Sequence, residues 1–297
     1  MINRHLSFLG GPTFALDALR YISETRLCRG LGDSLMYMHD IGGLPWWATV
    51  TVAAMGTRAL LFPTELHLQR KAALGLNVGL ALGKKLQEEA KKQQKMRGWT
   101  EEETRKKFAA EFALQKQILD VRYNLQVAPR ICLTVLHMGA WILLSLALRN
   151  LCGGVHFIPG EIHPLLTMQN EGMLWFPNLL KRDVVLPSII ACSSLGTLFI
   201  HVQAQPKMVK NPGKKLTRSQ LVYYFIVGSQ LGLTATFIVI AFAAPSALSY
   251  LWFLSSFTGL LQQVLFHHRQ LKQYFGILPS PWDIGAKKAP AQHGEKH

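Results

Sequence analysis

Five apolar stretches, each long enough to cross a lipid bilayer as a helix, leave this chain few ways to fold. A bilayer core requires roughly 20 consecutive apolar residues, and the chain of 297 residues comes close to or meets that length in five places. They are residues 44–63, 131–148, 184–203, 221–243 and 246–266. With 16% charged and 49% hydrophobic residues, the chain is also poor in charge for a soluble domain. The sequence therefore predicts an all-α polytopic membrane protein with five transmembrane helices.

The basic side chains lie mostly on one side of the five predicted spans. Lys and Arg outnumber acids by 14 to 8 in residues 64–130, by 5 to 0 in 204–220 and by 5 to 2 in 267–297. On the opposite side, residues 1–43 hold 4 of each kind, and 150–183 hold 2 basic and 3 acidic residues. Because Lys and Arg gather on the side that is not translocated, we expect the N-terminus outside and the C-terminus inside. The basic face is a candidate surface for anionic lipid headgroups and, as an alternative, for ribosomal RNA.

The connections between the spans suggest three further parts. Residues 1–43 carry apolar side chains at roughly helical spacing, which predicts an amphipathic segment on the outer surface. Trp46 and Trp47 follow, where an aromatic belt would anchor the first span. Ala244 and Pro245 form a connection so short that the last two spans must be an antiparallel pair. Residues 267–297 are a short tail on the basic side.

Residues 67–128 predict a helical hairpin on the basic side. The chain turns at Gly98 and Trp99, and the next residues, Thr100 to Glu103, form a capping box that starts a second arm. Glycines at 75, 79 and 83 weaken the first arm, because each costs about 1 kcal/mol of helix propensity, so we expect a close-packed and frayed base. The alternative is a solvated charged loop.

The composition of the spans excludes several kinds of chemistry. Four Cys show no CxxC or other metal-ligand spacing, so neither a metal site nor a disulfide framework is predicted. The spans contain many hydroxyls and amides but no Asp or Glu. A proton relay or ion-coupled transporter normally needs such a carboxylate, and a nucleophile with His137 as its base would lack an orienting acid. We therefore predict a protein that is not an enzyme and has no catalytic residues, cofactor or metal.

Arg58 is the only fully charged side chain within the five spans. An Arg near the middle of a spanning helix costs roughly 2.5 to 3.5 kcal/mol on insertion scales, so a functional role is expected. By helix rise it lies about 7 to 8 Å from the basic end of its span, which leaves two interpretations. The guanidinium either snorkels to lipid headgroups, or it faces a water-filled groove between helices that lowers the cost of moving a polar peptide segment into the bilayer.

The order of several motifs resembles the YidC/oxidase-assembly/Albino insertase family, and within it the mitochondrial branch that assembles cytochrome c oxidase. The resemblance covers about residues 40 to 268. It rests on residues 43–47 (GLPWW), Arg58 followed by Pro63, the hairpin turn at Gly98 and Trp99, residues 146–150 (LALRN), residues 172–177 (GMLWFP), Pro245 with Ser246, Trp252, residues 255–257 (SSF) and Gln262.

The resemblance implies a non-enzymatic insertase with a polar intramembrane groove. Arg58 would be the arginine of that groove, with His137 at a position where the family usually has Gln and Trp252 on the groove face of the last span. We add Gln230 and Ser256, polar residues of the fourth and fifth spans, to the candidate groove. The hairpin turn would make first contact with client membrane proteins.

The resemblance also implies a location and partners. It predicts a multi-pass protein of the mitochondrial inner membrane, with its N-terminus in the intermembrane space and its C-terminus in the matrix. The expected client is cytochrome c oxidase subunit 2, with oxidase assembly factors as further partners. The tail at 267–297 lacks the long basic extension of the ribosome-bound branch, so strong ribosome binding is not expected.

The chain departs from the family pattern at groove positions. The usual Gln-x-Pro of the second span is His137-Met138-Gly139, and Leu251 replaces a Tyr that would precede Trp252, while Tyr250 stands one position early. These changes put the shape of the groove in question. Two other functions stay open: a small-solute transporter or channel, which would need paired intramembrane charges or an internal repeat, and a scaffold for oxidase assembly that never contacts clients.

Overall fold

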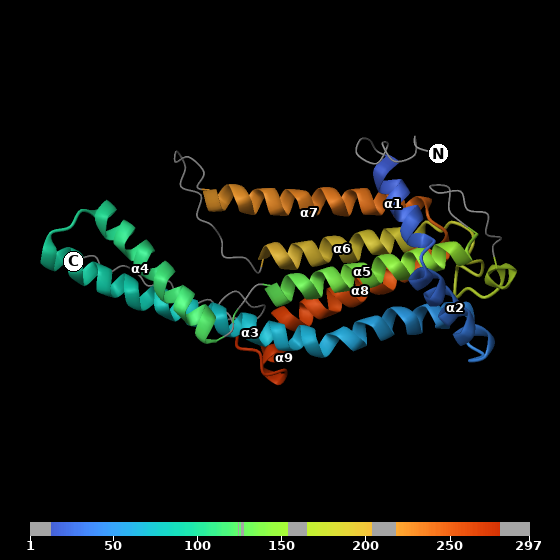
Figure 1. Ribbon diagram of the computed structural model, residues 1–297, viewed down its shortest axis with the longest axis horizontal. Helices are drawn as coiled ribbons and strands as arrows, with labels where there is room; N and C mark the ends of the chain where they lie inside the picture. Colours follow the sequence, from blue (N-terminus) through green and yellow to red (C-terminus); the bar gives the residue numbers. More distant parts are fainter. Residues whose placement is uncertain (1–12, 124, 126–127, 154–164, 204–217, 280–297) are drawn as a thin grey trace. The chain divides into compact units, whose positions relative to one another are not determined.

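The computed structural model describes residues 13–123, 125, 128–153, 165–203 and 218–279, and its elements are helical throughout (Figure 1). The helices are α1 (Thr13–Ser23), α2 (Arg26–Asp40), α3 (Trp46–Arg97), α4 (Glu101–Arg122), α5 (Ala128–Leu151), the 3₁₀ helix η2 (Leu166–Gln169), α6 (Val185–Gln203), α7 (Arg218–Ala243), α8 (Ser246–His267) and α9 (Arg269–Tyr274). The prediction of an all-α fold is confirmed for these residues.

Each of the five apolar stretches forms a helix or part of one. The helices differ in the length of their apolar part. Within the described residues, one helix is long and apolar enough to cross a membrane, Ile131–Leu151 in α5. Two shorter apolar segments follow, Val185–Ile200 in α6 and Val227–Ala243 in α7. Arg58 in α3 and the paired glutamines 262 and 263 in α8 lower the hydropathy of the other two helices. The topology of five spans therefore stays a prediction.

Clustering of the chain gives two compact units. The first comprises the described parts of Met1–Leu61, Val135–Val202 and Lys207–Gln263. In this unit α5, α6, α7 and α8 run along roughly one direction (Figure 1). Large side chains from several helices fill one core. Fully buried members include Trp46, Leu148, Leu186, Ile190 and Leu251.

Helix α7 exposes large apolar side chains. Phe225, Leu233 and Val239 are each at least 70% exposed. Such exposure is what the predicted membrane span over residues 221–243 requires.

The last two apolar helices are joined as the sequence predicts. Helix α7 ends at Ala243 and α8 starts at Ser246, and α8 runs back in the opposite direction (Figure 1). Near the turn, the Ser249 hydroxyl donates to the carbonyl oxygen of Ala241 at 3.2 Å. The aromatic rings of Phe237 and Trp252 lie 4.9 Å apart between the two helices.

The predicted amphipathic segment consists of two helices in its described part. Helix α1 ends at Ser23, and the Thr25 side chain starts α2 by accepting a hydrogen bond from the Cys28 N–H at 3.3 Å. Cys28, Gly32 and Leu35 are the buried residues of α2. Their spacing of four and three residues places them on one face.

The expectation that Trp46 belongs to an aromatic belt is wrong. Its side chain is 1% exposed, and its indole Nε1 donates to the Thr167 hydroxyl at 2.9 Å. The ring stacks on His39 at 4.5 Å. Its backbone N–H donates to the carboxylate of Glu171 at 3.0 Å. The segment after α5 supplies Thr167 and Glu171, and α2 supplies His39. Trp46 is therefore a core residue, whereas Trp47 is only partly buried.

The same loop makes a tight turn at residues 172–177. The Gly172 N–H donates to the Pro177 carbonyl at 2.8 Å, and Met173 and Phe176 bond each other through their backbones. A Cβ at Gly172 would collide with the Phe176 carbonyl, so only glycine fits there. Phe176 is buried and Trp175 is 47% exposed, so only one of the two is free to contact a membrane surface.

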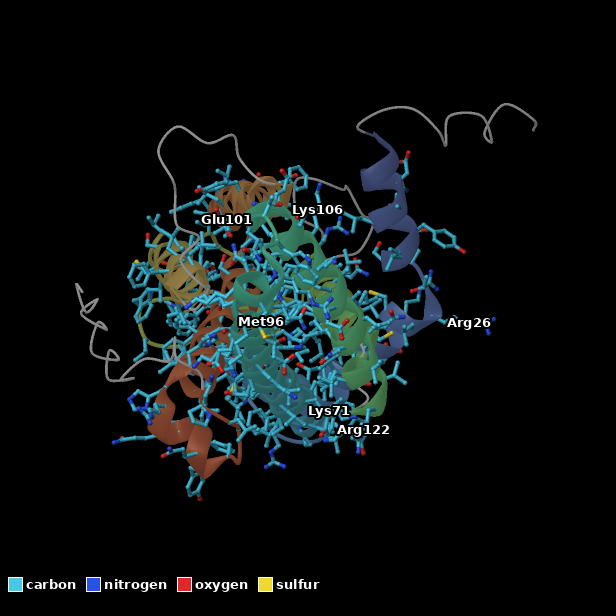
Figure 2. The ribbon with its side chains drawn as sticks, turned by 90° about the vertical axis from the view of Figure 1, so that its left-hand side faces the viewer. Arg26, Lys71, Met96, Glu101, Lys106 and Arg122 are labelled. Atoms are coloured by element: carbon cyan, nitrogen blue, oxygen red, sulfur yellow. The ribbon has the colours of Figure 1, made fainter. Side chains whose placement is uncertain are left out.

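The second unit comprises the described parts of Phe62–Thr134, Gln203–Pro206 and Val264–His297. Figure 2 views its hairpin from the end, with Lys71 and Met96 on α3 and Glu101, Lys106 and Arg122 on α4. Helix α3 is unbroken through Pro63 and through the three glycines, so the expected fraying is wrong. Leu125 lies against Gly75, where an added Cβ would be 3.0 Å from it, which is the close packing that the sequence predicted.

The hairpin turns where the sequence places the turn. Gly98 has a φ of +65°, a conformation that glycine adopts at little cost. The capping box is confirmed: the Thr100 hydroxyl accepts from the Glu103 N–H, and the Glu103 carboxylate accepts from the Thr100 N–H at 3.1 Å. This hydrogen bond from the Thr100 backbone lowers the pKa of Glu103.

Candidate functional site

The guanidinium of Arg58 is bonded to helix α8 within the first unit. Its Nη1 donates to the side-chain oxygen of Gln262 at 2.7 Å, and its Nη2 donates to the backbone carbonyl of Ser255 at 2.8 Å. The side chain is half-buried. Both of these acceptors are neutral, so these two bonds orient the guanidinium without adding an opposite charge.

Arg58 also borders a small hollow between α3, α5 and α8. The other lining residues are Thr57, Leu61, His137, Ala140, Trp141, Leu144 and Ser255. The hollow has room for about one water molecule. Its lining residues include two sites expected from the sequence, Arg58 and His137, and no Asp or Glu. The arrangement is a positively charged recess in apolar surroundings that carries no acid of its own.

Trp252 lies behind this hollow instead of lining it. It is 7% exposed, its indole Nε1 donates to the Ser145 hydroxyl at 3.0 Å, and its ring packs on Trp141 at 5.9 Å. Trp141 itself lines the hollow. Trp252 can therefore set the position of a lining residue, but it does not face the recess.

The two added polar residues occupy other places. The Ser256 hydroxyl accepts from Ser193 of α6 at 3.0 Å and donates to the Phe253 carbonyl at 3.1 Å, so it joins α8 to α6. Gln230 of α7 is partly buried, and its side-chain oxygen is buried without a hydrogen-bond partner among the described residues. Neither residue lines the hollow with Arg58.

The departures from the family pattern fit into continuous helices. Helix α5 passes through Gly139 unbroken, and a Cβ there would meet nothing within 4 Å. Leu251 is 1% exposed in the core. The Tyr250 hydroxyl, one position earlier, shares a hydrogen bond with the Thr51 hydroxyl at 2.8 Å. Tyr250 therefore joins α8 to α3 at Thr51, which precedes Arg58 in the sequence.

Sequence reasoning missed the role of Gln262 as a partner of Arg58. The signal was available in part, because Ser255, Gly259 and Gln262 recur at spacings of four and three, which places them on one face of a helix. A Cβ at Gly259 would lie 3.5 Å from Nη2 of Arg58. The pairing of this face with Arg58 depends on how α3 and α8 pack, which the sequence pattern does not contain.

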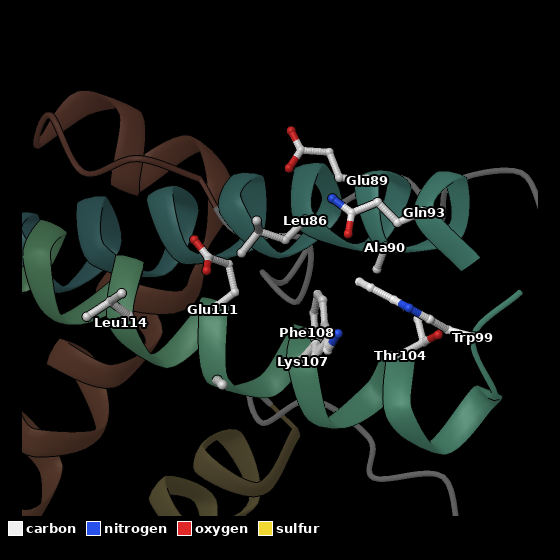
Figure 3. Close-up of a pocket in the computed structure, with 11 residues that line it drawn as sticks. Leu86, Glu89, Ala90, Gln93, Trp99, Thr104, Lys107, Phe108, Glu111 and Leu114 are labelled. Carbon is white, nitrogen blue, oxygen red and sulfur yellow. The ribbon is translucent and has the colours of Figure 1, made fainter. Parts of the chain in front are cut away.

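A second candidate surface lies between the two arms of the hairpin, near the predicted contact residues Gly98 and Trp99. A groove with a cavity volume of about 530 Å³ separates α3 from α4 (Figure 3). Leu86 and Ala90 of α3 and Phe108 of α4 supply apolar lining. Trp99 closes the end near the turn.

Two cations hold Trp99 in place. The ammonium of Lys107 lies 3.6 Å from the centre of the indole ring, and the guanidinium carbon of Arg97 lies 5.2 Å from it. Cations over an aromatic face are attracted by its negative quadrupole. Gly98 supplies the turn, and it does not itself line the groove.

None of these sites has the ligands of a metal centre. In the parts of the chain that the structure describes, no three His, Cys, Asp or Glu side chains cluster as metal ligands would. The thiol of Cys152, a partly buried residue, lies 3.9 Å from the Met168 sulfur, and burial raises its pKa to about 12. A thiol with such a pKa stays protonated and is a poor nucleophile.

The chain is similar to curated proteins from mammals. It is 26% identical over 265 residues to the cytochrome c oxidase assembly protein COX18, mitochondrial, of Homo sapiens. The aligned region covers 86% of this chain and 74% of the human protein. The proteins of the same name from Mus musculus and Pongo abelii are each 25% identical, over 259 and 261 residues, covering 84% and 86% of this chain and 74% and 75% of theirs. No family model matches the chain.

The described helices place Arg58 at the border of a small recess with apolar neighbours. The similarity in sequence is to the COX18 proteins, which are a branch of the YidC/oxidase-assembly/Albino family.

Proposed function

We propose that this protein is an insertase of the mitochondrial inner membrane that acts in cytochrome c oxidase assembly. In this proposal it promotes insertion and export of client segments without catalysing a chemical reaction. The client is the C-terminal part of cytochrome c oxidase subunit 2. The protein crosses the membrane five times, with its N-terminus in the intermembrane space and its C-terminus in the matrix.

The observation that carries this proposal is the environment of Arg58. It lies beside a recess with no acidic lining residue, and the two acceptors that it contacts on α8 are neutral. A cation in a low-dielectric site attracts an anionic group far more strongly than it would in water. In this proposal Arg58 attracts an acidic client tail to the border of the recess for the short time in which the apolar helix of the client enters the bilayer.

The names of the relatives support the choice of process and compartment. The human, mouse and orangutan proteins carry cytochrome c oxidase assembly and mitochondrial location in their names. The 24 to 6 distribution of basic residues supports a matrix side for the hairpin and the tail. The hairpin groove near Trp99 would then meet clients before they reach Arg58, and oxidase assembly factors are further partners.

Replacing Arg58 tests the proposal directly. Arg58→Ala removes the charge, and we expect export of an acidic-tailed client to fall about tenfold or more, because a hydrogen bond to a charged group contributes about 1.5–3 kcal/mol. Arg58→Lys keeps the charge but loses the planar fork of donors, so part of the export should remain. The measurement is protease accessibility of the client tail in mitochondria that contain each variant.

A control and a contrary result complete this experiment. Leu60→Ala truncates a side chain that is 80% exposed on the same helix, and it should leave export unchanged. Normal export by Arg58→Ala, at an unchanged amount of protein in the membrane, would refute the role assigned to the recess.

A further inference from the structure

The turn at residues 172–177 holds a bulky residue in a conformation that few residues adopt. Leu174 has a φ of +53°, in the left-handed region that favours glycine and asparagine and strains other side chains. Its side chain is 75% exposed, so contacts with the core do not explain why leucine stands there. Strain of this kind clusters at sites that bind ligands or partners. The tip of the turn, Leu174 with Trp175, is therefore a candidate contact surface.

Hydrogen bonds fix the direction of this tip. Met173 and Phe176 bond each other through their backbones at 3.2 and 3.0 Å, and Phe176, which is 4% exposed, anchors the turn in the core. The indole Nε1 of Trp175 donates to the Asp183 carboxylate at 3.4 Å. The same carboxylate accepts from the Leu186 N–H at 2.7 Å. The tip is thereby tied to the first turn of α6.

The segment that follows the tip lies where predicted spans begin and end. The Ser246 N–H and hydroxyl donate to the Lys181 carbonyl oxygen at 2.7 and 2.6 Å, and the Ala247 N–H donates to the Leu179 carbonyl oxygen at 2.9 Å. Helix α6 starts shortly afterwards, at Val185. These bonds bring together the boundaries of three predicted spans, at residues 184, 243 and 246. The tip is therefore placed at the level at which those helices would enter a bilayer.

The exposed side chains that follow the tip combine basic and apolar groups. Lys181 and Arg182 are exposed. Val185, Cys192 and Phe199 are exposed at spacings of seven residues, which places them on one face of α6. Aromatic and basic side chains are the groups that anchor a span at the surface of a membrane. Because the apolar face runs along a predicted span, a bilayer is the partner that would cover it in full.

We propose that the tip is a membrane anchor, in which Leu174 and Trp175 insert into the interface of the bilayer where α6 enters it. The strained turn directs an apolar side chain outward at a position where the backbone alone favours glycine. This inference goes beyond the proposed function, because it requires α6 to span the membrane and does not involve the recess at Arg58.

Photo-crosslinking identifies what covers the tip. The full chain, with a diazirine-bearing residue at position 174, is reconstituted in vesicles of phosphatidylcholine and phosphatidylglycerol. Mass spectrometry then counts adducts with lipid, with protein and with water. The control carries the same residue in place of Met96, which is 78% exposed and lies about 50 Å along α3 from the predicted end of the first span at Pro63.

We expect lipid adducts to be about tenfold more frequent at position 174 than at position 96. Equal frequencies at the two positions would overturn the anchor. Adducts at position 174 that are mainly with protein would also overturn it, because a protein partner would then cover the tip.

A second series tests whether the side chain of Leu174 inserts the tip. The diazirine-bearing residue stands at position 175, and residue 174 is varied. Leu174→Asn suits the left-handed backbone better than leucine does but is polar, whereas Leu174→Met stays apolar. We expect lipid adducts to fall about threefold or more in Leu174→Asn and to be kept in Leu174→Met. Because asparagine favours the turn, such a fall cannot come from loss of the turn.

Equal lipid adducts in the asparagine and methionine variants would overturn the role of Leu174. The vesicles contain no client, so failure of either series leaves the role of Arg58 in export untouched. Normal export by Arg58→Ala would, in turn, leave the anchor in place.

Discussion

At the scale of single residues, Arg58 shows how neighbouring groups orient a charge in apolar surroundings. Its Nη1 and Nη2 donate to two neutral acceptors on α8 at 2.7 and 2.8 Å. Hydrogen bonds of this kind lower the cost of burying a charge and fix the direction in which the guanidinium points.

Trp46 gives a stability prediction at this scale. Trp46→Phe removes the indole N–H that donates to Thr167 and leaves space in a fully buried site. We expect the free energy of unfolding to fall by about 1–3 kcal/mol, because a hydrogen bond is lost and a small cavity is left in the core. Chemical or thermal unfolding of the purified protein in detergent measures this change.

The neighbouring residue supplies the control for Trp46. Trp47 is only partly buried, so Trp47→Phe should cost clearly less. Equal losses for the two variants would show that Trp46 acts at a membrane surface and not in the core. That result would restore the belt interpretation that the structure contradicts.

At the scale of elements, the first arm of the hairpin shows three glycines with different surroundings. A Cβ at Gly75 would lie 3.0 Å from Leu125, one at Gly83 would lie 3.6 Å from Phe112, and one at Gly79 would meet nothing within 4 Å. Only Gly75 is therefore constrained by close packing. At Gly79 and Gly83 no tight contact offsets the loss of helix propensity.

This difference predicts opposite effects of alanine at two positions. Gly79→Ala should stabilise the hairpin by up to about 1 kcal/mol, because alanine favours the helix and no neighbour is displaced. Gly75→Ala should give no such gain, because Leu125 must move. Hydrogen exchange of the hairpin amides in the full chain measures both, and a gain at Gly75 equal to that at Gly79 would contradict the packing.

The sequence predicted local features of the elements and missed the contacts between distant ones. The capping box at Thr100, the turn at Gly98 and the short connection at Ala244 and Pro245 are encoded within a few residues, and each is found in the structure. The side-chain hydrogen bonds of Trp46 and Arg58 reach residues that are 121 to 204 positions away in the chain. Spacing cannot reveal such pairs, because they depend on which helix faces meet.

The candidate site was predicted only in part for the same reason. Arg58, identified by its charge and its position within a span, and His137, identified by the resemblance, border one recess. Trp252, Ser256 and Gln230 were chosen by residue type or by resemblance, and they lie elsewhere. The direction in which a polar side chain points in an apolar helix is set by packing, and the hydrophobic pattern of a helix that is apolar all round gives no face to read.

At the scale of the whole molecule, the predicted topology follows from charge and can be measured. Lys and Arg on one face outnumber those on the other by 24 to 6, so we expect the hairpin turn and the C-terminus on the matrix side. A protease site placed at Gly98 should be cut only after the inner membrane is opened, whereas one placed in residues 154–164 should be cut once the outer membrane is removed. Cleavage of both sites in intact mitoplasts would refute five spans.

The hydrogen bond from the Trp46 N–H to the Glu171 carboxylate sets the order in which parts of the chain can fold. Glu171 lies 125 residues after Trp46, and at synthesis rates of about 5–20 residues per second it leaves the ribosome about 6–25 seconds later. Through that interval the first N–H groups of α3 wait without the partners they have in the folded protein. The start of the first predicted span is therefore completed late, after α5 and the loop that follows it have been made, and folding of the outer surface cannot finish from the N-terminus alone.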